Sequence, residues 1–194
     1  MIQALIETNG SGKVYELTTK EIKTLDAGSW FSEDFSGEKV PTLKEVLQEI
    51  SPGFKLIIEL KYGTNKYPQI EEKTIKLIEE FKLENQVILK AFSTEILDRF
   101  EILAPDIPRL YTIFGSWGFI TIDNFIRFRS ATDIKNVDYY QAHKYFITQS
   151  LVNNIHAAGK KVIAWGVKPK DSEAMVKLGV DLVEVDWPRG YKDN

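Results

Sequence analysis

The 194-residue chain contains no cysteine, two histidines and two methionines. Without cysteine, disulfides, thiolate nucleophiles and cysteine-ligated metals are excluded. The net charge is −3 and no block of basic residues is present, which argues against a surface for nucleic acid or anionic membranes. No apolar run approaches the roughly 20 residues of a membrane-spanning helix, and the N-terminal sequence lacks the pattern of a signal peptide. We therefore expect a soluble chain, and the composition leaves its cellular location unknown.

Short apolar runs alternate along the chain with amphipathic segments. Six runs have the length and aliphatic content of buried strands, and they span residues 56–61, 87–92, 109–114, 137–142, 162–167 and 182–186. Capping residues and a 3.6-residue period predict helices over 42–50, after Pro68, after Ser93 or Thr94, from Thr148 to Gly159, and from Asp171 or Ser172 to Gly179. Residues 115–136 mix both periods, and we interpret them as irregular with a short helix.

Strands that alternate with helices predict right-handed crossovers and a parallel sheet, so the fold class is α/β. Six such units are three quarters of an eight-unit TIM-type (β/α) barrel. An open six-stranded sheet with helices on both faces is the alternative. No glycine-rich phosphate loop follows any strand, which weakens a dinucleotide-binding interpretation.

Two strands carry pairs of charged residues at alternate positions. Glu59 and Lys61 share one face of an otherwise aliphatic strand, and burial of either charge alone would be costly. Glu184 and Asp186 repeat this spacing in the last strand, and with Glu59 they could supply oxygen ligands to a divalent cation. The alternative for each residue is an ordinary structural role, with Lys61 in solvent and one of the acids turned outward.

The remaining chemistry-bearing residues are few. His143 follows a strand and could face the same strand-end surface, whereas His156 occupies a helix C-terminus, where its charge suits the helix dipole. Trp165 could line a pocket or pack in the core. No Ser/His/Asp arrangement and no His-Glu-x-x-His motif is present. These residues alone do not supply an obvious acid–base pair.

Five sequence blocks resemble the glycerophosphodiester phosphodiesterase family, of the phospholipase C-like phosphodiesterase superfamily. KLIIELK is similar to the Ile-Glu-Ile-Lys strand of that family. TNGSGKVYELTTKEIKTLDAGSWF, VPTLKEVLQEI, LVNNIHAAGKKVIAWGV and LGVDLVEVDWP resemble its other blocks in the same order. Together the blocks cover essentially the whole chain.

The resemblance implies a (β/α)8 barrel that hydrolyses glycerophosphodiesters to glycerol 3-phosphate and an alcohol, a reaction of lipid metabolism. It also implies a divalent cation, calcium or magnesium, and two histidines that act as acid and base. By matching position, Glu59 corresponds to a metal ligand, Lys61 to a lysine that contacts the phosphate or neighbouring ligands, and Trp165 to a wall of the substrate cavity. Asp186 corresponds to the acid of a Thr-Asp-x-Pro block, which reads Val-Asp-Trp-Pro here.

The sequence departs from the family pattern in its N-terminal region. A His-Arg-Gly strand, a Glu-x-Asp metal pair and a His-Asp turn are expected but are not in this chain, and Met1 matches a position just after the second histidine. We therefore expect residues 1–194 to form a single partial barrel domain, N-terminally truncated, without the first two strands. The chain would keep one of three metal ligands and neither catalytic histidine, so we do not expect it to bind the cation well or to be active alone.

Three further hypotheses follow from this reading. The chain could be a non-catalytic module that binds a phosphoester or phosphate, or a fragment that needs a partner chain. Glu59, Glu184 and Asp186 could form a replacement metal site. Open sheet edges on the strands of Glu59 and Asp186 could also cause self-association, because unpaired strand edges recruit other chains.

Overall fold

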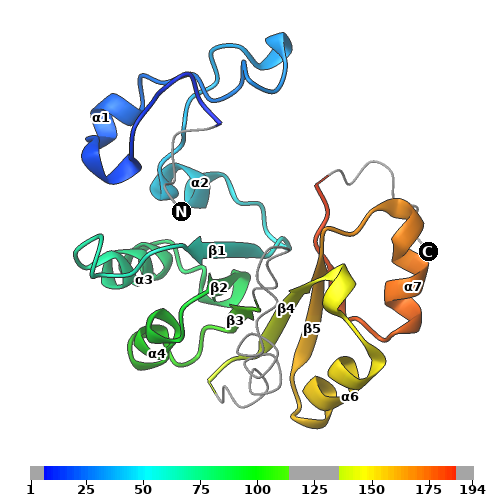
Figure 1. Cartoon of the computed structure of the whole chain (residues 1–194). Coiled ribbons are helices and arrows are strands. Elements are labelled where there is room, and N and C mark those ends of the chain that lie inside the picture. The colour runs from blue at the N-terminus through cyan, green and yellow to red at the C-terminus, as the bar shows by residue number, and fades with distance from the viewer. Residues whose placement is uncertain (1–6, 114–135, 187–194) are drawn as a thin grey trace. The chain divides into compact units, whose positions relative to one another are not determined.

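The computed structural model describes residues 7–113 and 136–186 (Figure 1). The chain divides into two compact units. The first comprises Met1–Phe54 and Thr64–Leu83, and the second comprises Lys55–Gly63 and Glu84–Asn194. The expectation of a single partial domain over residues 1–194 stays a prediction. The predicted irregular segment 115–136 lies almost wholly outside the described residues.

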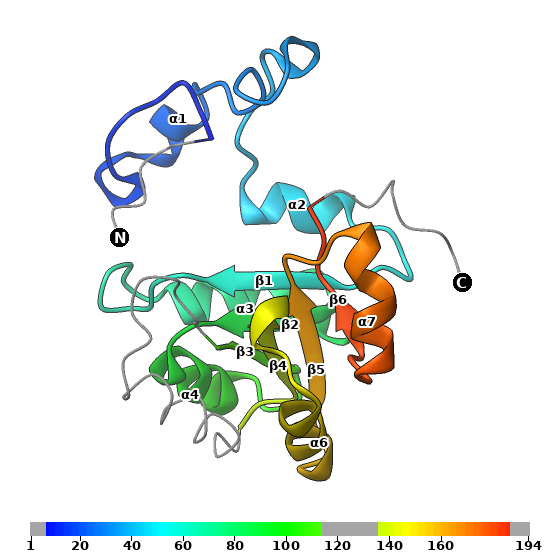
Figure 2. The ribbon, with the colours of Figure 1, turned by 45° about the vertical axis from the view of Figure 1, so that its right-hand side comes forward.

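The second unit contains a sheet of six parallel strands in the order β1-β2-β3-β4-β5-β6. Strands that are adjacent in the sheet are also consecutive in the chain, and the strand order never reverses. This is the pattern of a (β/α) barrel, whereas the strand order of a doubly wound sheet reverses at a switch point. The curled half-barrel in Figures 1 and 2 therefore confirms the predicted fold class. The strands are β1 Leu56–Leu60, β2 Val87–Ala91, β3 Arg109–Thr112, β4 Tyr139–His143, β5 Lys161–Trp165 and β6 Leu182–Val183.

All six strands differ from the predicted ranges at one end or both. β5 stops at Trp165 because Gly166 adopts a φ of +69°, a left-handed conformation that turns the chain out of the sheet. β4 begins at Tyr139, two residues later than predicted. β6 has two residues, although the N–H of Glu184 still donates to the carbonyl of Ala164 at 2.7 Å and continues the line of the strand. In the described sheet β1 pairs only with β2, and β6 only with β5.

Three helices of this unit are α4 Thr94–Leu103, α6 Gln149–Ala157 and α7 Ser172–Lys177, and they lie along the outside of the curl (Figures 1 and 2). α4 packs against β2 and β3, and α6 packs against β5. The hydroxyl of Thr148 accepts a hydrogen bond from the N–H of Leu151 at 3.2 Å, which confirms the predicted N-cap. Short 3-10 segments span Glu84–Gln86, Lys144–Phe146 and Pro169–Asp171.

Successive side chains along each strand point to opposite faces of the sheet. A buried apolar cluster joins four strands on one face, and its members are Ile88, Leu110, Tyr139 and Ile163. We call this the inner face. Because side chains repeat every two residues, the next inner positions toward the strand ends are Lys90, Thr112, Gln141 and Trp165. The apolar cluster therefore forms the floor beneath these more polar side chains.

The first unit contains α1 Thr19–Ile22, α2 Leu43–Glu49 and α3 Ile70–Glu80, with 3-10 segments at Val14–Glu16 and Glu33–Phe35. α3 begins two residues later than Pro68, because Gln69 has a left-handed φ of +62°. α2 begins as predicted, with Thr42 and Glu45 in a capping box. Within residues 7–113 and 136–186, no helix combines the length and apolar character needed to cross a membrane.

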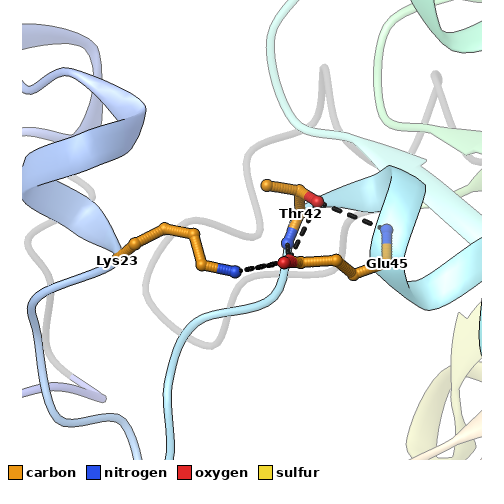
Figure 3. Close-up of polar contacts among 3 residues, drawn as sticks. All are labelled: Lys23, Thr42 and Glu45. Carbon is orange, nitrogen blue, oxygen red and sulfur yellow. Dashed lines mark hydrogen bonds and ion pairs between the residues drawn. The ribbon is translucent and has the colours of Figure 1, made fainter.

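Figure 3 shows how Glu45 ties two parts of this unit together. Its carboxylate accepts from the N–H of Thr42 at 2.7 Å, and the ammonium of Lys23 lies 2.5 Å from both of its oxygens. The contact with Lys23 and the bonds from Thr42 lower the pKa of Glu45 to about 2. The carboxylate of Glu45 therefore caps the N-terminus of α2 and also binds Lys23, the residue that follows α1.

Candidate functional site

A continuous layer of polar side chains lies on the inner face above the apolar floor. We call it the inner polar layer, and it consists of Glu59 from β1, Lys90 from β2, Thr112 from β3, Gln141 from β4 and Glu184, which follows β6. Strand register brings neighbours together, since Glu59 pairs with Lys90 and Thr112 pairs with Gln141. The layer lies toward the C-terminal ends of the strands, where the active sites of β/α barrels are found.

Lys90 occupies the centre of the charged half of this layer. Its ammonium nitrogen lies 3.0 Å from Oε2 of Glu59 and 3.6 Å from Oε2 of Glu184. The residue is only 8% exposed, so its charge cannot be satisfied by bulk water. The two carboxylates therefore compensate the burial of the ammonium, and the ammonium holds carboxylates from opposite ends of the described sheet.

Gln141 connects the charged half to the rest of the layer. Its side chain is fully buried, and its amide nitrogen donates to Oε2 of Glu184. Its amide oxygen accepts from the hydroxyl of Thr112 at 2.9 Å. Because one end of the amide accepts and the other donates, Thr112 sets the orientation that presents the N–H group to Glu184. The position of Glu184 is thus determined by a buried hydrogen-bond chain.

Lys61 lies next to this layer, because it is two residues after Glu59 and therefore on the same face. Its ammonium is 4.0 Å from Oε1 of Glu59, and its side chain is 55% exposed. Glu59 and Lys61 therefore form an ion pair only at the limit of ion-pair distance, and the closer partner of Glu59 is Lys90. Glu59 thus has one buried and one exposed ammonium beside it, and only the exposed one is open to a ligand.

His143 and Trp165 form a second group at the ends of β4 and β5. Their ring centroids are 4.5 Å apart in an edge-to-face arrangement, and the strand register pairs the two residues. Gly166 allows this packing, since a Cβ atom there would lie 2.6 Å from Nε2 of His143. The buried indole Nε1 of Trp165 has no hydrogen-bond partner among the described residues. Trp165 is half-buried, which fits the predicted wall of a cavity.

The protonation state of His143 follows from its surroundings. Burial lowers the pKa of its imidazole, and the positive charge of Lys144 lowers it further. Nδ1 accepts a hydrogen bond from the N–H of Tyr145 at 3.4 Å, so in the neutral ring Nε2 carries the proton. Lys144 is itself buried and paired with Asp171, which anchors the segment after β4.

His156 lies elsewhere, as its helix-terminal position predicted. Its Nε2 is 2.9 Å from Oδ2 of Asp181, and the same oxygen accepts from the N–H of Val162 at 2.8 Å. Val162 is at the beginning of β5, whereas Trp165 is at its end. His156, in α6, therefore lies near the start of β5 and cannot join the inner polar layer.

A divalent cation, which the resemblance implies, would need several oxygen ligands. The buried Oε1 of Glu59 has no hydrogen-bond partner among the described residues, which suits a metal ligand. However, Glu59 and Glu184 are both held by Lys90, and Asp186 is exposed. Across residues 7–113 and 136–186, no three histidine, cysteine, aspartate or glutamate side chains are grouped to hold a metal. The described residues do not fit a complete cation site.

Sequence reasoning identified Glu59, Lys61 and Glu184 but overlooked Lys90, Thr112 and Gln141. The signal for Lys90 was the same one that drew attention to Glu59, namely a single charge inside a buried aliphatic strand. Gln141 likewise interrupts a buried run of β4. Polar residues at the inner positions of adjacent strands are therefore the sequence signal that indicates this layer.

Comparison with known proteins gives a consistent result. The profile of the glycerophosphoryl diester phosphodiesterase family matches residues 6–189. A glycerophosphodiester phosphodiesterase of Caldanaerobacter subterraneus subsp. tengcongensis is 36% identical over 189 residues, covering 93% of this chain and 72% of the relative. The structure of an Oleispira antarctica phosphodiesterase in complex with the product sn-glycerol-3-phosphate is 28% identical, with a TM-score of 0.73 and coverage of 94% and 72%. A glycerophosphodiester phosphodiesterase structure from Agrobacterium tumefaciens, 22% identical with a TM-score of 0.73, covers 95% of this chain and 75% of its own and supports the fold.

Proposed function

Because the chain belongs to the glycerophosphoryl diester phosphodiesterase family, we propose that its inner face binds the glycerol phosphate part of a glycerophosphodiester. The reaction served is hydrolysis: water adds to phosphorus, the bond to the alcohol oxygen breaks, and the alcohol leaves with a proton. The products are glycerol 3-phosphate and an alcohol. The observation that carries this proposal is the exposed ammonium of Lys61 beside the inner polar layer at the C-terminal strand ends, where it completes the charge balance of Glu59, Lys90 and Glu184.

In this proposal Lys61 binds the phosphate. Its side chain is the exposed cation of the group, and Glu59 restrains it at 4.0 Å. Trp165 and His143 provide an apolar wall at the ends of β4 and β5, and the neutral imidazole adds no charge of its own. The binding surface therefore combines one charge with a flat aromatic face.

Proton transfer is the part of the reaction that these residues do not complete. In-line cleavage of a phosphodiester requires charge neutralisation on the phosphate and proton movement on both sides. The 194 residues contain two histidines, and of these only His143 is at the C-terminal strand ends. A calcium or magnesium ion would likewise need ligands beyond Glu59. We therefore expect the 194-residue chain to bind glycerol 3-phosphate but to hydrolyse diesters at background rate.

Binding and turnover are tested separately. Isothermal titration calorimetry with glycerol 3-phosphate should give a saturable signal that Lys61→Gln weakens by about tenfold or more, the loss of one charged contact. Lys55→Gln is the matched control, since Lys55 is an exposed lysine immediately before β1. Equal affinities for the two variants would refute the role of Lys61.

Turnover is measured as glycerol 3-phosphate released from glycerophosphocholine, with and without calcium or magnesium. A robust metal-dependent rate from the 194-residue chain would show that its own residues supply the missing proton transfer. In the same preparation, light scattering tests a proposed self-association through the edges of β1 and β6, each paired on one side in the described sheet. A monomer with cooperative unfolding would refute that association.

A further inference from the structure

Lys90 has no role in the proposed function so far, yet it is the most constrained charge of the inner polar layer. It is 8% exposed, and its ammonium contacts carboxylates from β1 and from the residue after β6. One of these carboxylates, that of Glu184, is also held by the buried amide of Gln141. An ammonium fixed between two oriented carboxylates occupies the kind of position that a bound cation takes in an acidic site.

We propose that Lys90 is a tethered cation that replaces a dissociable divalent ion between Glu59 and Glu184. Its charge lets the inner face take a phosphomonoester without added metal. This inference deepens the proposed function and rests on it for the phosphate ligand. The effect of Lys90 on metal affinity rests on the contacts of Lys90 alone.

Lys90 affects the affinity of Glu59 for a divalent cation. Calcium or magnesium bound to Oε1 of Glu59 would lie about 2.0–2.6 Å from that oxygen. Lys90 already lies 3.0 Å from the other oxygen of the same carboxylate. The metal would thus bind on the order of 5 Å from a buried ammonium, in surroundings that screen charge poorly. Repulsion between the two cations therefore weakens metal binding as long as Lys90 is charged and in place.

Lys90 also sets the net charge that a phosphate meets at the inner face. Glu59 and Glu184 contribute two negative charges, and Lys90 and Lys61 contribute two positive charges. With Lys90 present the group is neutral, and the exposed ammonium of Lys61 can attract a phosphate. Without Lys90 the group has an excess negative charge that repels the ligand, and a soluble cation would be needed to restore the balance.

The test compares the wild-type chain with Lys90→Gln, which removes the charge and keeps a polar side chain of similar length. Lys55→Gln, the exposed lysine before β1, controls for the loss of one positive charge. Calcium affinity and glycerol 3-phosphate affinity are measured by calorimetry, the latter once in EDTA and once in calcium. Far-UV circular dichroism checks that each variant is folded.

The expected results are specific to Lys90. Wild type and Lys55→Gln should bind glycerol 3-phosphate with the same affinity in EDTA and in calcium, within about twofold. Lys90→Gln should bind calcium about tenfold or more tightly than wild type, and its phosphate binding should become calcium-dependent. Equal calcium affinity of Lys90→Gln and wild type would overturn the proposal.

Two other outcomes are also decisive. If Lys90→Gln does not fold, the wild-type titration decides, because a calcium dissociation constant tighter than about 10⁻⁴ M would contradict a site already filled by an ammonium. If no form binds glycerol 3-phosphate but Lys90→Gln gains calcium affinity, the proposed ligand is wrong and the role of Lys90 stands.

Discussion

The packing of His143 against Gly166 allows a quantitative prediction about the candidate site. A Cβ atom at residue 166 would lie 2.6 Å from Nε2 and 2.8 Å from Cδ2 of the imidazole. Gly166 also has a φ of +69°, which disfavours any residue with a side chain. Gly166→Ala therefore introduces two separable costs, one from the backbone and one from the collision with His143.

The two costs can be estimated separately. A left-handed alanine costs about 1–2 kcal/mol relative to glycine. The collision adds about 1–3 kcal/mol, typical of overpacking, because the imidazole is held by Trp165 and Tyr145 at centroid distances of 4.5 and 4.8 Å. Gly159→Ala is the matched control: its φ is +73° and a Cβ atom there meets nothing within 4 Å. It should show only the backbone cost.

The measurement is the free energy of unfolding from urea denaturation followed by circular dichroism. Gly166→Ala should be less stable than Gly159→Ala by about 1–3 kcal/mol. In a His143→Ala background, Gly166→Ala should cost no more than Gly159→Ala, because the ring that it strikes is absent. A displaced His143 should also weaken glycerol 3-phosphate binding, and Gly159→Ala should leave that binding unchanged.

Equal destabilisation by Gly166→Ala and Gly159→Ala in the wild-type background would contradict a collision with His143. So would an unchanged cost of Gly166→Ala after removal of the His143 ring. Either result would mean that His143 does not rest on Gly166, and the wall formed with Trp165 would have to be abandoned.

Three further changes test other contacts. Glu45 has a folded-state pKa lowered to about 2, so its stabilisation is present above its usual value near about 4.3 and is lost as the pH falls toward 2. Glu45→Gln should flatten this acid dependence of the urea midpoint, and an unchanged profile would exclude the Lys23 contact. Asp181→Asn should likewise reduce the loss of stability below about pH 4. Although burial raises the pKa of Asp181, the hydrogen bond from Val162 and the contact with the neighbouring histidine outweigh it, and the pKa is lowered. Gln141→Leu should lower the free energy of unfolding by about 1–3 kcal/mol, since it leaves a buried hydroxyl without its acceptor and a carboxylate without its donor. An unchanged value would show that the chain of hydrogen bonds through Gln141 is not formed.

Local pattern was sufficient for the elements of this fold. Aliphatic runs of strand length predicted all six strands, and the hydroxyl of Thr148 and the capping box at Thr42 marked two helix starts correctly. The period of two also placed Glu59 and Lys61 on one face. The ends of strands were less accurate, as at Gly166, because a left-handed turn can stop a strand whose residues could have continued it.

Local sequence pattern could not predict which residues pair with one another across the sheet. The sequence shows that a charge at position 90 interrupts a buried strand, but many distant acids could have neutralised it. The register of β1 with β2 selects Glu59, and the curl of the sheet brings Glu184 to the same ammonium. Periodicity depends only on residues that are close together in the chain, so it can be read from the amino-acid sequence. The bridge that Lys90 makes between the carboxylates of Glu59 and Glu184 depends on how the strands of the sheet curl toward one another, which no single segment encodes.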